Sequence, residues 1–261
     1  MSLLHRIDWL IALILGAIAT LGFAPFSFWP APVLALALLF VLCAHRGWKK
    51  AALLGWLFGL THFASGIYWV FISTHLYGGA PAWLGVLLVA VLCTYLAIYP
   101  ALVCGIAARL ACWRSASGWL VVPALWLLSE LLRGWVYTGF PWLSLGYVAL
   151  DMPAERIAPL IGTHGLSFLF AASAYGVSRS FSASGWQRPL ALGIALLPLI
   201  GVLVPAPEHW TQDSAPPLRV AIVQGNVPQD QKWDLSATEE ILQRYRAMTL
   251  AAADAELVVW P

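Results

Sequence analysis

The sequence predicts a polytopic α-helical membrane protein whose chain continues, after residue 204, into the start of an α/β domain. Of the 261 residues, 61% are hydrophobic and 10% are charged, whereas soluble domains average roughly 45–50% and 25%. Asp and Glu are absent from Trp9 through Ser129. A soluble core cannot bury this much apolar surface, so the apolar segments are expected to lie in a lipid bilayer.

About seven apolar segments are predicted to cross the membrane. They are residues 8–23, 31–44, 51–72, 82–108, 119–132, 164–179 and 190–204. Gly, Pro and Ser clusters separate several of them, as expected for turns. Some of the segments are shorter than the ~20 residues that usually span a bilayer, and flanking aromatic and small residues are expected to complete them. Residues 1–204 are therefore predicted to form a transmembrane helical domain.

Cationic residues orient this domain. If the amino terminus is cytoplasmic, that side holds Arg6, Arg46, Lys49, Lys50, Arg109, Arg114, Arg179 and Arg188. The exterior loops hold only Arg133 and Arg156. Positive charge gathers on the cytoplasmic side of membrane proteins, so the chain after residue 204 is expected outside. In a bacterium with two membranes, this means the inner membrane, with a soluble part in the periplasm.

The polar tail has the pattern of a strand, a helix and a second strand. Residues 205–217 (PAPEHWTQDSAPP) are a linker by composition, and 218–223 form an apolar run whose two faces are both apolar. Ser236 and Glu239 have the spacing of a capping box. The helix after them places Glu240 and Arg244 at i,i+4, and 256–260 is the next strand. Residues 218–261 are too few to close a core, so the sequence is expected to stop within a domain.

Two motifs carry a resemblance to a known family. RVAIVQGNVPQDQKW (219–233), followed by ELVVWP (256–261), resembles the start of the nitrilase-type domain of apolipoprotein N-acyltransferases. SELLRGWVYTGFPWLSLGY (129–147) is similar to the segment before the sixth span of that family. Seven spans before a periplasmic domain also match the family's order. The resemblance implies a nitrilase-like α-β-β-α domain beginning at 218.

The resemblance also implies an activity, the last step of bacterial lipoprotein maturation. Such enzymes move a fatty acyl chain from a glycerophospholipid, through a cysteine thioester, to the α-amino group of a diacylglyceryl-cysteine on an apolipoprotein. The expected partners are the phospholipid donor, the apolipoprotein acceptor and the bilayer. No cofactor and no metal are implied. A formal net charge of +2 and the lack of a basic patch exclude nucleic acid as a partner.

The resemblance places the catalytic residues outside the sequence. Nitrilase-type enzymes use a Glu base, a Lys that stabilises the oxyanion and a Cys nucleophile. The Glu would directly follow Trp260-Pro261, so no catalytic residue is expected within the chain and the chain alone is expected to be inactive. The cysteines all precede the polar tail and are expected to be small hydrophobic residues in helices. They are Cys43, Cys93, Cys104 and Cys112.

The tail offers three candidates for substrate binding. Trp233 occupies the position of a family Trp that lies near the active-site mouth, although a Trp at a helix start is often a packing residue. Gln224 and Asn226 follow a strand end, where sites in α/β folds gather. A turn-forming role for these two residues is an equal alternative.

The membrane part offers four more candidates, Glu130, Arg133, Phe140 and Trp142. A buried charge in a membrane needs a partner, so an i,i+3 ion pair between Glu130 and Arg133 is one interpretation. The other is that Arg133 binds a lipid phosphate at the outer headgroup level. Gly139-Phe140-Pro141-Trp142 is expected either to line an opening for lipid or to form a re-entrant turn.

Two other classes of function stay open at this point. A transporter or channel requires paired polar residues in several spans, and only Glu130, His62 and a few hydroxyls qualify. His62 is expected to be hydrogen-bonded structure, and His75 and His164 are not spaced as metal ligands. A membrane-anchored amidase or hydrolase would pass its acyl group to water rather than to an amine.

Overall fold

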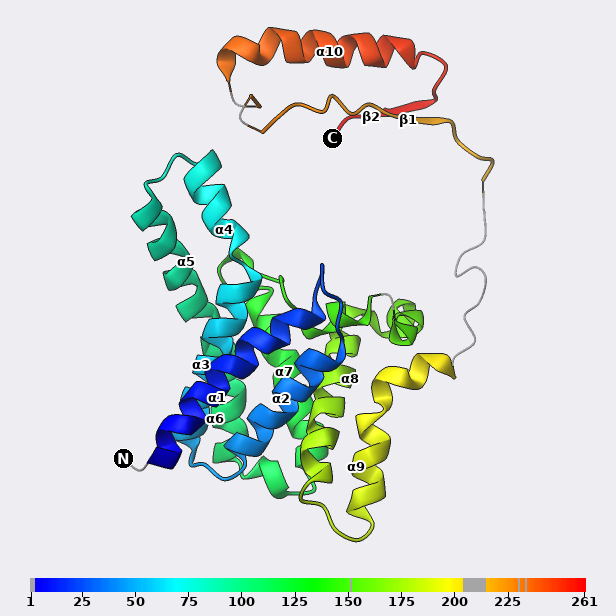
Figure 1. Ribbon diagram of the computed structural model, residues 1–261. Helices are drawn as coiled ribbons and strands as arrows, with labels where there is room; N and C mark the ends of the chain where they lie inside the picture. Colours follow the sequence, from blue (N-terminus) through cyan, green and yellow to red (C-terminus); the bar gives the residue numbers. More distant parts are fainter. Residues whose placement is uncertain (1–2, 151, 204–214, 230, 233) are drawn as a thin grey trace.

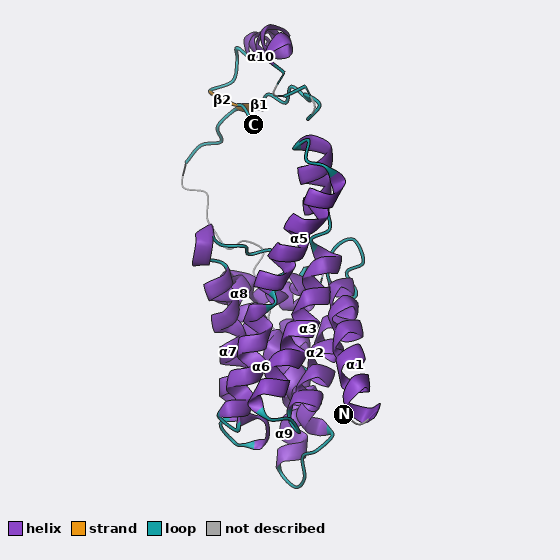
Figure 2. Ribbon diagram, turned by 90° about the vertical axis from the view of Figure 1, so that its left-hand side faces the viewer, coloured by secondary structure: helices purple, strands orange, loops and turns teal. Residues whose placement is uncertain are grey.

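The computed structural model describes residues 3–150, 152–203, 215–229, 231–232 and 234–261, with side chains from Ile7 onward. Most of the described chain is helical, which confirms the predicted helical class (Figures 1 and 2). The α-helices described in the apolar part are α1 (Leu3–Ala19), α2 (Pro30–Cys43), α3 (Trp48–Gly66), α4 (Trp69–Ile72), α5 (Ala82–Leu96), α6 (Ile98–Arg109), α7 (Gly118–Arg133), α8 (Ala158–Ser180) and α9 (Gln187–Ala195).

Short helical turns connect these helices. They are η1 (Thr20–Gly22), η2 (Ser73–Tyr77, a π-helical turn), η3 (Cys112–Arg114), η4 (Val136–Thr138), η5 (Leu145–Ala149), η6 (Pro153–Ile157) and η7 (Leu197–Val202). Three of them, η4 to η6, lie between α7 and α8. The described residues of 134–157, between α7 and α8, therefore form short turns and loops. They lie between two of the predicted spans.

Helix occupies each of the predicted apolar segments, and two stretches within the described residues are long and apolar enough to cross a membrane. These are Ala82–Arg109 and Pro153–Ser180. Trp48–Gly66 and Trp69–Tyr77 reach that length together, with a bend of 52° between them. Ile7–Gly22 and Pro30–Cys43 are shorter apolar helices. Length and composition thus support a membrane helical domain.

Small residues set the packing of the bundle. α3 packs against α1 and α6, and α8 packs against α2, α7 and α9. A Cβ on Gly16 of α1 would collide with the Phe58 carbonyl of α3, and one on Gly55 would collide with the Pro100 carbonyl of α6. Small residues at these crossings let the helix backbones approach closely, as in membrane bundles. α4 and α5 pack together and extend beyond the neighbouring helices (Figures 1 and 2).

The polar tail forms the predicted strand, helix and strand. β1 (Val220–Ile222) and β2 (Leu257–Val259) pair in parallel, and η8 (Leu235–Ala237) and α10 (Thr238–Ala251) connect them. The register pairs Ile222 with Val259. Ile222 is 76% exposed, so the described residues do not cover both faces of β1 as its apolar pattern predicts.

The predicted capping box is wrong, because Asp234 takes the place expected for Ser236. The Asp234 carboxylate accepts hydrogen bonds from the Ser236 amide (2.8 Å) and from the Ser236 hydroxyl (2.7 Å). Both bonds favour the charged carboxylate, and they hold the pKa of Asp234 below its ordinary value. Glu239 accepts instead from the Gln243 side chain, at 2.7 Å. The ionised carboxylate is a stronger acceptor than the serine hydroxyl.

Candidate functional site

Arg133, the last residue of α7, holds the loop that follows the helix. Its side chain is only 3% exposed. One Nη donates to the carbonyl oxygen of Phe140 at 2.6 Å and also to that of Trp142, and the other Nη donates to the Ser144 hydroxyl at 3.1 Å. The Phe140 amide returns a 2.7 Å bond to the Arg133 carbonyl. The fork of the guanidinium suits several acceptors at once, so this side chain fixes the loop.

Glu130 holds the far end of the same loop from one turn earlier on α7. Its Oε1 accepts from the Leu145 amide at 2.8 Å and from Trp126 Nε1 at 2.9 Å. The second carboxylate oxygen, Oε2, is buried and has no hydrogen-bond partner among the described residues. Glu130 and Arg133 thus bind two ends of one loop.

The expected ion pair between these two residues is not formed. The salt bridges in the described part of the chain join Asp8 to Arg46, Arg219 to Asp254, and Glu240 to Arg244. Sequence spacing places Glu130 and Arg133 on neighbouring positions of one helix face, but both side chains point to loop atoms. The loop supplies one backbone amide for the acid and two carbonyls for the base, so neither group needs the other as its direct partner.

The loop presents aromatic side chains at the surface. The rings of Phe140 and Trp142 lie 4.8 Å apart, and Trp142 contacts Trp69 of α4 at 5.8 Å. Phe140 is half-buried and Trp142 is 49% exposed. An aromatic pair with one exposed member, beside an apolar helix, suits an interface with lipid.

The backbone of this loop is unusual. Gly139 has φ of 82°, and a Cβ there would collide with the Gly134 carbonyl. Tyr137, Thr138 and Leu143 also have positive φ, a conformation that costs energy for residues with side chains. The bonds from Arg133 and Glu130 offset this cost and hold the loop in one shape.

The second candidate site lies at the carboxyl ends of β1 and β2. A pocket of about 590 Å³ there is lined by Gln224, Asn226, Tyr245, Trp260 and Pro261, among others. Parallel strands place their carboxyl ends at one edge of the sheet. Gln224 and Asn226 are exposed, and Asn226 has φ of 47°, a left-handed conformation that Asn adopts more readily than most residues.

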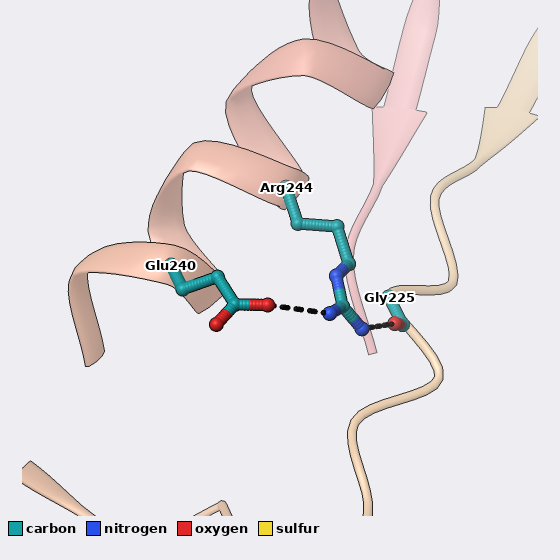
Figure 3. A network of polar contacts seen from close by, with 3 residues as sticks. All are labelled: Gly225, Glu240 and Arg244. Atoms are coloured by element: carbon teal, nitrogen blue, oxygen red, sulfur yellow. Dashed lines mark hydrogen bonds and ion pairs between the residues drawn. The ribbon is translucent and has the colours of Figure 1, made fainter. Parts of the chain in front are cut away.

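The turn that carries Gln224 and Asn226 is fixed to α10. Arg244 donates to the Gly225 carbonyl at 3.1 Å and to Glu240 at 3.1 Å, which confirms the predicted i,i+4 pair (Figure 3). A Cβ on Gly225 would lie 2.5 Å from the Tyr245 ring. The Tyr245 ring also contacts Trp260, at 5.0 Å between centroids. The helix between the strands therefore shapes the edge pocket.

Trp233, the first candidate in the tail, lies outside the described residues. The remaining candidates fall into two groups: Glu130, Arg133, Phe140 and Trp142 around one loop, and Gln224 and Asn226 at one strand edge. Sequence reasoning missed Ser144 and Tyr245. Ser144 carries no sequence signal, and Tyr245 has none beyond its place in the helix after the first strand.

Among the described residues, the histidines and cysteines do not form a metal centre. His62 is buried, with Nδ1 at 3.5 Å from the Thr20 hydroxyl and its ring stacked on Phe58. No group of three or more His, Cys, Asp or Glu residues that could hold a metal occurs among the described residues. The four cysteines are free and buried.

Comparison with known proteins identifies relatives along the whole chain. The family profile described as "Apolipoprotein N-acyltransferase N-terminal domain" matches residues 15–176. Three curated relatives named "Apolipoprotein N-acyltransferase" come from Methylococcus capsulatus, Shewanella oneidensis and Pseudomonas syringae pv. tomato. The first is 38% identical over 97% of this chain and 50% of its own length. The second is 39% identical over 100% and 50%, and the third 36% over 97% and 51%. The chain therefore spans about half the length of the curated relatives it matches.

Proposed function

The chain belongs to the apolipoprotein N-acyltransferase family, and from that premise we propose that its protein completes the acylation of bacterial lipoproteins. A fatty acyl chain passes from a glycerophospholipid to a cysteine thioester and then to the α-amino group of the diacylglyceryl-cysteine of an apolipoprotein. The observation that carries the proposal is that one chain combines an apolar helical bundle with a β-α-β start, and that relatives match across both parts. A transporter would require paired polar residues in several spans, and only Glu130, His62 and a few hydroxyls qualify.

The proposed topology has seven spans and a cytoplasmic amino terminus in the inner membrane. The positive-inside distribution supports it, as does helix in each predicted segment. Residues 205–217 would then link the bundle to a periplasmic nitrilase-like domain that starts at residue 218. This arrangement brings the acyl donor in the bilayer and the apolipoprotein, which is itself held in the membrane by its diacylglyceryl group, to one surface.

The edge pocket is proposed as part of the acyl-transfer site. Gln224 and Asn226 line it, and Trp233 follows the same turn in the sequence. By resemblance, the Glu, Lys and Cys of the reaction belong to the half of the relatives that this chain does not cover. Polar groups at the strand ends would orient the substrate beside them.

The loop after α7 is proposed as the contact with the acyl donor. Phe140 and Trp142 supply the aromatic surface, and Arg133 and Glu130 hold it in place. Direct binding of a lipid phosphate by Arg133 is a separate hypothesis, because a guanidinium that is 3% exposed reaches a phosphate only if the loop opens. In the first role, Arg133 holds the loop in place before the donor binds. In the second role, Arg133 contacts the lipid phosphate after the loop has opened.

The test is transfer of a labelled acyl chain from phosphatidylethanolamine to a diacylglyceryl peptide by the full-length protein. Transfer to the peptide amine is expected, and release of free fatty acid to water alone would support a hydrolase instead. Gln224→Ala is expected to lower kcat/KM at least about tenfold, the loss of one to two hydrogen bonds. Gln231→Ala, outside the pocket, is the matched control and should retain activity.

A further inference from the structure

A groove of about 370 Å³ opens on the outer wall of the bundle between α3 and α6. Its volume lies in the range of roughly 300–1,000 Å³ that is usual for small-molecule sites. Small side chains form its floor: Ala52 of α3 and Ala101 and Gly105 of α6. A Cβ on Gly105 would lie only 3.0 Å from the Cβ of Ala52, so the two helices meet closely at the floor.

Large side chains stand on both sides of this floor. Trp48 and Trp56 line the groove from α3, and Leu102 and Ile106 line it from α6. Trp48, Leu102 and Ile106 are exposed, so the groove faces away from the bundle. The groove follows α6, whose 12 residues extend roughly 18 Å at 1.5 Å per residue, little more than one leaflet of a ~30 Å hydrocarbon core.

Positive charge gathers at one end of the groove. Arg109 lines that end, and Lys49 Nζ lies 5.5 Å from the centre of the Trp48 ring. The α3 helix begins there, at Trp48, and α6 ends there, at Arg109, so the two helix dipoles oppose each other and the positive charge comes from the side chains. No Asp or Glu occurs from Trp9 through Ser129, and Asp8 pairs with Arg46. Within the described residues, neither Arg109 nor Lys49 forms an ion pair.

We infer that this groove holds one acyl chain of an anionic glycerophospholipid, with the phosphate bound by Arg109 and Lys49. The apolar part matches a hydrocarbon chain, and the cationic end matches a phosphate in charge and in position. A zwitterionic headgroup fits less well, because its ammonium group would lie among these cations. With the proposed topology, the lipid occupies the cytoplasmic leaflet, so it is a resident lipid and not the acyl donor on the opposite side. It would cover the α3–α6 contact.

The test measures lipid retained by the purified protein in detergent, by native mass spectrometry, after incubation with phosphatidylglycerol or with phosphatidylcholine. We expect one phosphatidylglycerol to remain on the unmodified protein. Ala101→Leu, which fills the floor, and Arg109→Gln, which removes the cation, should each lower retention at least about tenfold. The matched controls make the same changes elsewhere: Ala90→Leu on an exposed face of α5 and Arg114→Gln at the same membrane side.

Each outcome decides the inference. Equal retention by the groove variants and the controls would overturn it, and equal retention of the two lipids would overturn the role of the cations. Circular dichroism and thermal unfolding check that the variants fold. Arg109 is exposed, so its variant remains informative if Ala101→Leu does not fold. Acyl transfer is not part of the readout, so the result is independent of the proposed function.

Discussion

Replacing Arg133 with Gln should release the loop that follows α7 while leaving the bundle folded. In the structure, the guanidinium makes three hydrogen bonds to the loop, to the Phe140 carbonyl, the Trp142 carbonyl and the Ser144 hydroxyl. A Gln side chain is shorter and has two donors on a single nitrogen. It cannot reach the three acceptors together, so the two partly buried carbonyls lose their hydrogen-bond donor.

The size of the effect follows from these bonds. A hydrogen bond from a charged donor contributes about 1.5–3 kcal/mol, and bonds in one network are not additive. Losing about two of these three bonds gives an expected loss of about 3–5 kcal/mol for local closure of the loop. At 1.4 kcal/mol per factor of ten, this corresponds to about two to three and a half orders of magnitude in the opening equilibrium.

Hydrogen exchange read by mass spectrometry measures this opening directly. Peptides that cover residues 139–146 should exchange about a hundredfold or more faster in Arg133→Gln, whereas α2 should keep its wild-type rate. Arg114→Gln, the same change at an exposed site, should leave the loop unchanged. Loop exchange within about threefold of wild type would refute the positioning role. The phosphate hypothesis would then gain support if added phospholipid slowed loop exchange only in the protein that keeps Arg133.

Three further predictions follow from other contacts. Glu130→Gln keeps an Oε1 acceptor for the Leu145 amide and should lower the unfolding temperature little. Glu130→Ala removes this acceptor and should lower the unfolding temperature by several degrees, at about 2–4 °C per kcal/mol. Equal effects of the two variants would contradict the loop contact. Gly225→Ala should push the Tyr245 ring aside and reduce acyl transfer by the full-length protein, and unchanged kinetics would show that the turn adapts. A membrane-impermeant thiol reagent should label Ala215→Cys but not Gly47→Cys in intact cells; labelling of Gly47→Cys would invert the topology.

Composition was sufficient to predict the helical class, but the predicted segments 51–72 and 82–108 are each divided into two helices. Long apolar runs and their Gly and Pro interruptions act locally, so helix appears in each predicted segment. The strand–helix–strand order of the tail was predicted for the same reason. The predicted cap was wrong because two acceptors, Asp234 and Ser236, stand within one turn, and Asp234 caps η8, the turn before α10. Spacing alone does not rank them, although the charge of Asp234 does.

The contacts of Glu130 and Arg133 could not be predicted, for a physical reason. Spacing on a helix shows which side chains are neighbours, and here it indicated an ion pair. Apart from Trp126, one turn before Glu130, the actual partners are atoms 7 to 15 residues further along the chain, and most of these belong to the backbone. Their positions depend on the left-handed turns at Tyr137, Thr138 and Leu143, which residues of these types rarely adopt.

The geometry of the strand edge shows how the described tail constrains the proposed site. Ile222 pairs with Val259, and Gln224 and Pro261 each lie two residues beyond that pair. Neighbouring strands run about 4.8 Å apart, so the same register would place Pro261 beside Gln224 and a residue joined to Pro261 beside Gly225. A Glu base after Pro261, as the resemblance implies, would follow a residue that lines the same pocket as Gln224 and Asn226. Arg244 and Tyr245 fix the turn on one side of this edge, and Trp260 donates to the Thr249 hydroxyl at 3.0 Å on the other. Because both strand ends are attached to α10, the helix sets the distance between the proposed base and the polar groups that would orient its substrate.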